Sequence, residues 1–198
     1  ELSVFGRVAG EQAAAFAREA PAAKGRDQAD AIEARALALL TQKGGGERHA
    51  TLRTEMATSL ERGCGIYRLG PEMQATCDTM ASLKQRYQAL TLEDSSRVWN
   101  TDWIGAIELG YQLDVAEAMA HAALFRTESR GAHQRLDGFD KRDDVNFLCH
   151  SLAHYQAGAA PRISTMPVKI TRSPPGQRAY GALGEQLEAA RKDAAHAR

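Results

Sequence analysis

The sequence lacks the features that most directly indicate a function. It has no net charge, because 25 Lys and Arg residues balance 25 Asp and Glu residues, whereas a nucleic-acid-binding protein shows a basic excess on one face. No apolar run approaches the roughly 20 residues that span a bilayer. The three cysteines form no C-x-x-C pair. We therefore expect no disulfide framework, zinc ribbon or iron–sulfur cluster, and we predict a reducing compartment.

Several catalytic and phosphate-binding motifs are also missing. The sequence contains no G-x-G-x-x-G, no P-loop and no G-x-S-x-G. The triple glycine at 44–46 lies between two predicted helices rather than after a strand, so we do not expect it to hold a phosphate. The opening "ELSVFGRVAG" has neither the basic start nor the cleavage site of a signal peptide. It starts without Met and is already periodic like a helix, so we expect a fragment of a longer protein.

What the sequence does contain is helical periodicity over most of its length. Apolar residues recur every three or four positions in segments bounded by proline and glycine. This pattern predicts helices over residues 2–20, 28–43 and 47–62, and from Pro71 onward. A fifth helix is expected to begin near Val98 and to break at Leu113. Asp114 and Glu117 then form a capping box, so a new helix should start there and end at Gly131.

Strands are predicted only near the C-terminus. The segments "NFLCHSLAHY" and "PRISTMPVKIT" are typical of strands, and "QAGAA" joins them as a loose hairpin loop. Residues 184–198 form a charged, alanine-rich tail. The predicted fold class is therefore mainly α, a helical bundle of about four or five helices with a small C-terminal β-hairpin.

Three histidines are candidates for chemistry. His150 and His154 are four residues apart, as in helical zinc sites, but they lie in a strand-like segment with no obvious third ligand. His121 lies on a largely apolar helix, where a core histidine is more common than a catalytic one. We therefore expect no metal site and no catalytic histidine.

The paired aspartates Asp143 and Asp144 have two interpretations. They could act as a general acid and base. They could instead cap a helix or turn that precedes the apolar run, and this is the interpretation we favour.

The densest charge pattern runs from Arg126 to Asp144, where basic and acidic residues alternate almost one for one. Arg126 and Arg130 are four apart at the predicted helix end, where cations suit the helix dipole. Arginine also binds carboxylates through two hydrogen bonds at once. We predict a paired structural or interface network, with a solvated charged loop as the alternative. The predicted members are Arg126, Glu128, Arg130, His133, Arg135, Asp137, Arg142 and Asp143.

Four stretches, taken together, resemble a known family. They are "ELSVFGRVAGEQAA", "ERGCGIYR", "NTDWIGAIELGYQLDVAEAMAHAALFRTESRGAHQRLDGFDKRDDVNFLCHSLAHY" and "VKITRSPPGQRAYG". In this order they are similar to the C-terminal part of the flavoprotein subunit of quinol:fumarate reductase, a family that includes the succinate dehydrogenase flavoproteins. The likeness covers about residues 1–182. L-aspartate oxidase carries a similar "ESRGAH" turn but not the hairpin after it, which favours the fumarate reductase branch.

The resemblance implies an oxidoreductase that interconverts fumarate and succinate at FAD. Electrons would pass between the flavin and an iron–sulfur subunit, and between that subunit and quinone through a membrane anchor. The complex would lie on the cytoplasmic, inner face of a bacterial inner membrane. The family's flavin-binding glycines, flavin-linking histidine and proton-donating arginine lie before the part that this chain matches. We therefore expect no catalytic and no FAD-binding residue here, and no activity from the chain alone.

The resemblance also implies a division of the chain within a larger α+β flavoprotein. The parts are residues 1–20, the last helix of the FAD-binding domain; 21–130, the C-terminal helical domain; 131–182, a charged loop and hairpin extension; and 183–198, a flexible charged tail. Expected partners are the FAD-binding domain, the iron–sulfur subunit and, through the apolar stripe of Leu2, Phe5 and Val8, a second copy. The alternatives are a non-catalytic helical scaffold, or the same domain of a succinate dehydrogenase or an L-aspartate oxidase.

Overall fold

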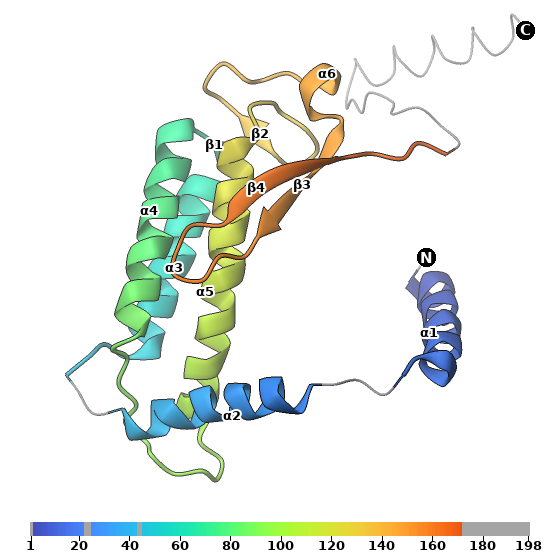
Figure 1. Cartoon of the computed structure of the whole chain (residues 1–198). Helices are drawn as coiled ribbons and strands as arrows, with labels where there is room; N and C mark the ends of the chain where they lie inside the picture. The colour runs from blue at the N-terminus through green and yellow to red at the C-terminus, as the bar shows by residue number, and fades with distance from the viewer. Residues whose placement is uncertain (1, 22–24, 43–44, 172–198) are drawn as a thin grey trace, which may run out of the picture.

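Three long helices form the body of the structure, a computed structural model that describes residues 2–21, 25–42 and 45–171. The helices α3 (His49–Cys64), α4 (Gly70–Tyr87) and α5 (Thr101–Phe125) pack side by side in up-down-up order (Figure 1). Pro71 lies in the first turn of α4, as predicted, because a helix start leaves the missing N–H of proline without consequence. The core between the helices includes Leu52, Met56, Met80, Leu83, Leu90, Ala106, Leu109, Leu113 and Ala116.

The prediction of two helices between Val98 and Gly131 is wrong, because α5 is one continuous helix. Leu113, the expected break, lies inside α5 and is 1% exposed, so packing against the bundle overrides the local capping signal. The actual cap is Asn100, whose side-chain oxygen accepts a hydrogen bond from the Trp103 N–H at 2.8 Å.

The residues of the predicted capping box have another role. Asp114 and Glu117 both bind Lys84 on α4, at 2.9 and 2.7 Å. The opposing hydrogen-bonded carboxylates raise the pKa of the Lys84 ammonium, although burial acts in the other direction and is the largest single influence. These two acidic residues therefore join α5 to α4 instead of starting a helix.

The C-terminal end of α5 also differs from the prediction. The helix ends at Phe125, and Arg126 is already extended. Gly131 has a φ of 59°, a left-handed value that suits glycine. It lies in a tight turn closed by two backbone hydrogen bonds between Arg130 and His133. Arg130 is therefore not at a helix end, and the helix-dipole argument for it is wrong.

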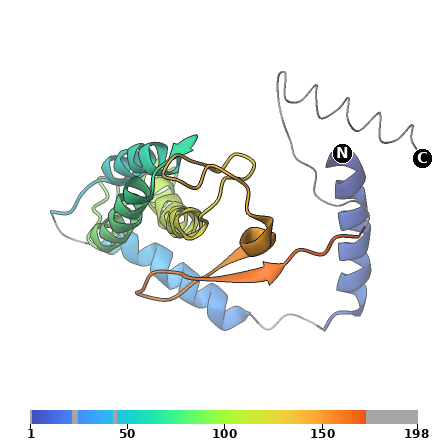
Figure 2. The same cartoon turned by 90° about the horizontal axis from the view of Figure 1, so that it is seen from above.

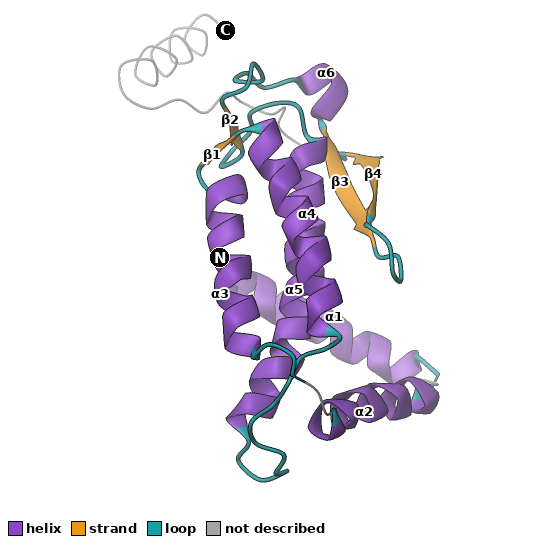
Figure 3. Cartoon of the chain, turned by 90° about the vertical axis from the view of Figure 1, so that its left-hand side faces the viewer, coloured by secondary structure: helices purple, strands orange, loops and turns teal. Residues whose placement is uncertain are grey.

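Two further helices lie outside the three-helix body. The helix α2 (Arg26–Thr41) crosses the end of the bundle opposite β1 and β2 (Figures 1 and 3). Trp103 fixes it there, because its indole N–H donates to the Ala36 carbonyl at 2.8 Å. The helix α1 (Leu2–Glu19) has no buried residue and stands apart from the bundle (Figure 2).

The strands form two small sheets. The pair β1 (Tyr67–Arg68) and β2 (Gln134–Arg135) is parallel and was not predicted. The strands β3 (Cys149–His154) and β4 (Arg162–Pro167) form the predicted antiparallel hairpin, with Cys149 opposite Pro167 and His154 opposite Arg162. The hairpin lies beside α5 (Figure 3). The first strand starts three residues later than predicted, because residues 144–147 form the short helix α6 (Asp144–Phe147).

The structure confirms the predicted fold class, a mainly α bundle with a small C-terminal β-hairpin. The tail at 184–198 lies outside the described residues. Within the described residues, no helix combines the length and apolar character required to cross a membrane.

Candidate functional site

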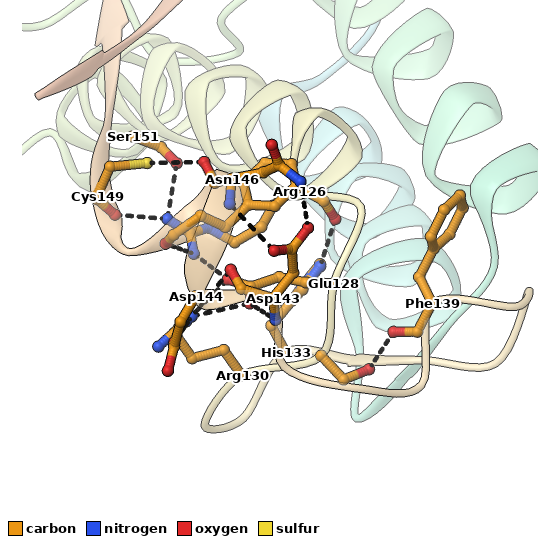
Figure 4. A network of polar contacts seen from close by, with 12 residues as sticks. Arg126, Glu128, Arg130, His133, Phe139, Asp143, Asp144, Asn146, Cys149 and Ser151 are labelled. Carbon is orange, nitrogen blue, oxygen red and sulfur yellow. Dashed lines mark hydrogen bonds and ion pairs between the residues drawn. The ribbon is translucent and has the colours of Figure 1, made fainter. Parts of the chain in front are cut away.

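A charged junction lies at the end of the bundle where α5 stops, and Glu128 is its centre. The Glu128 side chain is fully buried. Arg130 donates to its two oxygens from Nε at 2.8 Å and from Nη2 at 3.0 Å, and Arg126 donates to the same carboxylate. The backbone N–H of Asp143 adds a further bond at 2.8 Å. Figure 4 shows these groups converging on one carboxylate.

Burial on its own would raise the pKa of the Glu128 carboxyl, because it penalises the charged form. The hydrogen bonds from Arg130, from the Asp143 backbone and from Arg126 outweigh that effect, so the pKa lies below its usual value. The hydrogen bond to Glu128, followed by the one to Asp144, holds the pKa of Arg130 above its usual range, although burial opposes them. Glu128 therefore stays ionised although it has no contact with solvent.

Arg126 connects this centre to the β-hairpin. Its guanidinium donates to the carbonyl of Phe147 at 3.0 Å and to that of Cys149 at 2.6 Å. The same group lies over the Phe147 ring, 5.4 Å from the ring centre. Because Arg126 directly follows α5, this one side chain fixes α6 and the start of β3 against the helix end (Figure 4).

The two aspartates of "RDD" have different positions in this junction. The Asp143 side chain accepts hydrogen bonds from the backbone N–H groups of Val145 and Asn146, both at 3.0 Å, so it caps α6. This is the cap that the sequence predicted. Asp144 instead pairs with Arg130 at 2.6 Å and with Arg142 at 2.9 Å.

His133 closes the turn that begins at Arg130. Its Nε2 is 3.0 Å from the Arg126 carbonyl oxygen, and its Nδ1 is 2.8 Å from the Arg68 guanidinium. This pattern suits a neutral ring that donates from Nε2 and accepts at Nδ1. Burial lowers the pKa of His133 and nearby arginines lower it further, while the bond to the carbonyl opposes them.

A second ion pair joins the junction to the start of α4. Arg135 is 4% exposed and binds both oxygens of Asp137, at 2.7 and 2.5 Å. Asp137 also accepts from the backbone N–H of Gly70 at 2.6 Å. The Arg135 hydrogen bond is the main cause that lowers the pKa of Asp137 to about 2. A carboxylate thus occupies the positive end of α4.

The start of α4, a helix that follows directly on a strand, does not offer a phosphate site for the flavin cofactor. A dinucleotide site uses free backbone N–H groups at a helix start that follows a strand. The one comparable place, between β1 and α4, is already filled, because Asp137 binds the Gly70 N–H and Pro71 has no N–H. A side chain at Gly70 would also approach the Asp137 carboxylate to 2.9 Å. We therefore derive no chemical step through FAD from these residues.

The histidine pair offers no metal site in the arrangement that the structure shows. His150 and His154 both lie on β3, where four residues span about 13 Å, and His154 is 2.7 Å from the Ser164 hydroxyl. Across the described ranges, no group of three or more His, Cys, Asp or Glu side chains could hold an ion. His121 is half-buried on α5.

The structure brings the eight predicted residues together in two connected clusters. In the first cluster, Glu128 accepts hydrogen bonds from Arg126, Arg130 and the Asp143 backbone. In the second, Arg135 pairs with Asp137. Arg135 also reaches the Arg126 carbonyl at 3.2 Å, the same oxygen that contacts His133. Arg142 joins the first cluster through its ion pair with Asp144.

Sequence reasoning missed several members of the junction. Ser129 accepts from the Arg135 N–H and donates to the Phe139 carbonyl, both at 2.8 Å, and Arg68 contacts His133. Asp144 was interpreted as an acid or a cap and counted among the charges of the stretch, but it was not named as a member of the network. The alternation of basic and acidic residues could have indicated that Asp144 takes part in the network. No local signal relates Arg68 to a histidine 65 residues later.

Comparison with known proteins gives the class of this domain. The family profile described as "Fumarate reductase flavoprotein C-term" matches residues 53–180, which include most of the bundle and the whole charged junction. The chain belongs to this family and is the C-terminal domain of a fumarate reductase or succinate dehydrogenase flavoprotein subunit.

Individual relatives agree with this assignment. The fumarate reductase flavoprotein subunit of Haemophilus influenzae is 51% identical over 195 residues, which are 97% of this chain and 32% of that protein. The Mycobacterium tuberculosis H37Rv counterpart is 43% identical over 91% of this chain and 32% of its own length. A succinate dehydrogenase flavoprotein subunit from Coxiella burnetii is 35% identical over 67% of this chain and 22% of that protein. The chain spans about a third of the length of the fumarate reductase relatives.

Solved structures have the same fold. An Escherichia coli quinol fumarate reductase structure superposes with a TM-score of 0.83 and 49% identity, covering 89% of this chain and 31% of that one. The Mycobacterium smegmatis Sdh1 complex gives 0.72 at 32% identity, covering 86% and 29%. These two are subunits of multi-subunit enzymes. The Archaeoglobus fulgidus adenylylsulfate reductase, at 17% identity and a TM-score of 0.67 over 83% and 28%, shares the fold alone.

Proposed function

We propose that the whole subunit to which this domain contributes is the flavoprotein of a quinol:fumarate reductase. It interconverts fumarate and succinate at FAD and exchanges electrons with quinone through an iron–sulfur subunit. The observation that carries this proposal is the 51% identity to a fumarate reductase flavoprotein over 97% of the chain. The fumarate reductase branch is favoured over the succinate dehydrogenase branch, because the Coxiella burnetii and rice succinate dehydrogenase flavoprotein subunits are only 35% and 28% identical.

Within that subunit, the domain itself is non-catalytic and binds no FAD. The filled helix start at Gly70 supports this, because Asp137 already occupies the place of an anion. Residues 1–20 would close the FAD-binding domain, and 21–130 would form the helical domain. Residues 131–182 would contribute the charged loop and hairpin extension.

The charged junction has a positioning role in this proposal. Glu128, Arg126 and Arg130 fix the loop after α5 and the hairpin in one arrangement on the bundle end. A surface held in this way suits contact with the FAD-binding domain and the iron–sulfur subunit, since a preordered surface loses little entropy on binding. The complex would be peripheral on the cytoplasmic face of a bacterial inner membrane, held there by a membrane anchor and without nucleic acid.

A chimeric subunit tests the proposal. The matched third of the Haemophilus influenzae relative is replaced by this chain, and the chimera is purified with the other subunits of that complex. We expect bound flavin and reduction of fumarate by a reduced dye. The matched control is the same subunit shortened before the replaced segment, which should lose both properties. A soluble, intact chimera that binds flavin but does not reduce fumarate would contradict the proposal that the whole subunit is a fumarate reductase flavoprotein.

The chain on its own provides the complementary test. We expect no flavin absorbance after purification with added FAD, and no fumarate-dependent oxidation of the dye above buffer. Stoichiometric flavin or measurable turnover by the 198-residue chain would contradict the non-catalytic role.

A further inference from the structure

A cavity of about 730 Å³ lies on the side of the bundle where α2, α4, α5 and the hairpin loop meet. Its walls are mainly apolar and include Leu39 of α2 and Ile107 of α5. Small residues leave the space open, among them Ala36 on α2 and Gly110 on α5. Cavities of about 300–1,000 Å³ with walls of this kind are the usual sites of small-molecule ligands.

Two cations contribute to the wall, and they differ in how far their charge is balanced. Lys84 forms ion pairs with Asp114 at 2.9 Å and with Glu117 at 2.7 Å, which gives two carboxylates to one ammonium group. Arg35 is exposed, and within the described residues no carboxylate lies at ion-pairing distance from it. A ligand that carries one negative charge would therefore find its counter-charge at Arg35 and not at Lys84.

Tyr111 holds the Arg35 side chain at this cavity. The guanidinium carbon lies 5.8 Å from the centre of the Tyr111 ring, a contact between a cation and an aromatic face. Such a contact uses the face of the planar guanidinium and leaves the N–H donors along its edge. Those donors suit a carboxylate, which accepts two parallel hydrogen bonds from one arginine.

We propose that this cavity binds an apolar monocarboxylate, with the carboxylate on Arg35 and the carbon body against Leu39 and Ile107. A second carboxylate on the ligand would meet repulsion, because Asp114 and Glu117 leave one negative charge in excess around Lys84. Dicarboxylates such as fumarate and succinate therefore do not fit this cavity. Fatty acids and aromatic acids share the required chemistry, and they differ in whether a chain or a ring fills the apolar part.

Titration of the 198-residue chain with phenylbutyrate, and separately with decanoate, tests the site. We expect a Kd of about 1 mM or below for at least one of them. Amide NMR signals of Gly110 and Gly158, which line the cavity, should shift, and that of Gly63, which is buried on α3, should not. Phenylbutanol has the same carbon body without the charge and should bind about tenfold more weakly than phenylbutyrate. Binding of decanoate alone would identify a chain as the natural body, and binding of phenylbutyrate alone a ring.

Variants separate a charge-specific site from unspecific apolar binding. Arg35→Gln should weaken the acids by about tenfold and leave phenylbutanol unchanged. Arg62→Gln is the matched control, because it removes the same charge from an exposed side chain of α3 that does not line the cavity; it should change neither Kd. Ala81→Trp narrows the cavity from α4 and should weaken every ligand. Equal binding of acid and alcohol, or acid binding that survives Arg35→Gln, would overturn the inference.

The chimeric subunit shows whether the site persists in the longer protein. Equilibrium dialysis with labelled phenylbutyrate compares the chimera with its Arg35→Gln version, and we expect about tenfold weaker binding by the variant. Equal binding by the two would mean that another part of the subunit occupies the cavity, which would overturn the inference. This comparison does not depend on whether the chimera reduces fumarate, so the proposed function and the ligand site can fail separately.

Discussion

The burial of Glu128 leads to a sharp prediction for Glu128→Gln. The substitution keeps the shape of the side chain but removes the charge that Arg126 and Arg130 both contact. It also places an amide N–H₂ group against donors, so at least one hydrogen bond becomes a clash of donors. Breaking a buried ion pair in this way costs about 3–5 kcal/mol.

The structure places the expected cost at the lower end of that range. The side chains of Arg126 and Arg130 are 13% and 26% exposed, so water can partly solvate the stranded cations, and Arg130 keeps Asp144 as a partner. We therefore expect a loss of about 3 kcal/mol in the free energy of unfolding. For a chain of this size the loss corresponds to a fall in Tm of about 6–12 °C.

Thermal unfolding followed by circular dichroism measures this loss, and an exposed ion pair of the same type provides the control. Arg48 and Glu93 are 3.0 Å apart, but their side chains are 57% and 65% exposed. Glu93→Gln should therefore cost only about 0–1 kcal/mol. A similar small shift for both variants would refute the reasoning, because it would mean that Glu128 is solvated and the junction is a loose charged loop.

Three more predictions concern single side chains. Leu113→Ala should cost about 2–5 kcal/mol in chemical denaturation, because Leu113 is 1% exposed; a cost near zero would mean that α5 is broken there. Burial lowers the pKa of His133, so the unfolded chain binds the proton more tightly and stability should fall as pH drops below the unfolded value of about 6.5. His133→Gln should flatten that dependence, and an unchanged slope would assign it to another group. Burial also raises the pKa of Cys77 to about 11, so iodoacetamide at pH 8 should modify Cys77 only after unfolding; modification of the native chain would contradict this.

The sequence predicted best those elements whose signals are local. Pro71 marks the start of α4 and Asp143 caps α6, and both effects act within a few residues. The hairpin was predicted for the same reason, because its two strands are neighbours in sequence. Its first boundary was wrong by three residues, since the cap at Asp143 makes residues 144–147 helical before the strand begins.

The errors lie where distant contacts decide the local conformation. Asp114 and Glu117 have the spacing of a capping box, yet Lys84 binds both from another helix, and Leu113 is held inside a continuous α5 by the core. Similarly, β1 pairs with β2 across more than 60 residues. Two-residue strands have no periodicity that could predict such a pair.

The charged residues of the candidate site could be predicted from the sequence, but the contacts between them could not. Ten charges between Arg126 and Asp144 indicated pairing, and the arginines pointed to bidentate contacts. Which acid is buried could not be read from the pattern, because Glu128 and Asp140 have similar charged neighbours in sequence. Glu128 is the buried one because three groups converge on it: Arg126 from the end of α5, Arg130 from the turn at Gly131, and the Asp143 N–H from the start of α6.

The role that we assign to this junction, orientation rather than net stability, leads to a last prediction. Replacing a buried ion pair by apolar residues of similar volume is often neutral or stabilising. Arg126→Met combined with Glu128→Leu still leaves Arg130 and the Asp143 N–H without the Glu128 carboxylate, although Arg130 keeps Asp144. The double variant should therefore cost about 1–2 kcal/mol, less than Glu128→Gln. The same double variant removes the Arg126 bonds to the carbonyls of Phe147 and Cys149.

Amide hydrogen exchange distinguishes the orientation of the hairpin from the stability of the bundle. The hairpin amides, such as that of Leu152, should exchange about tenfold faster in the double variant, because the hairpin loses its fixed attachment to α5. The amide of Leu109, in the core of the bundle, serves as the internal control and should keep its rate. If the double variant were as unstable as Glu128→Gln, the network would be a main source of stability. If the hairpin amides kept their rates, Arg126 would not orient the hairpin.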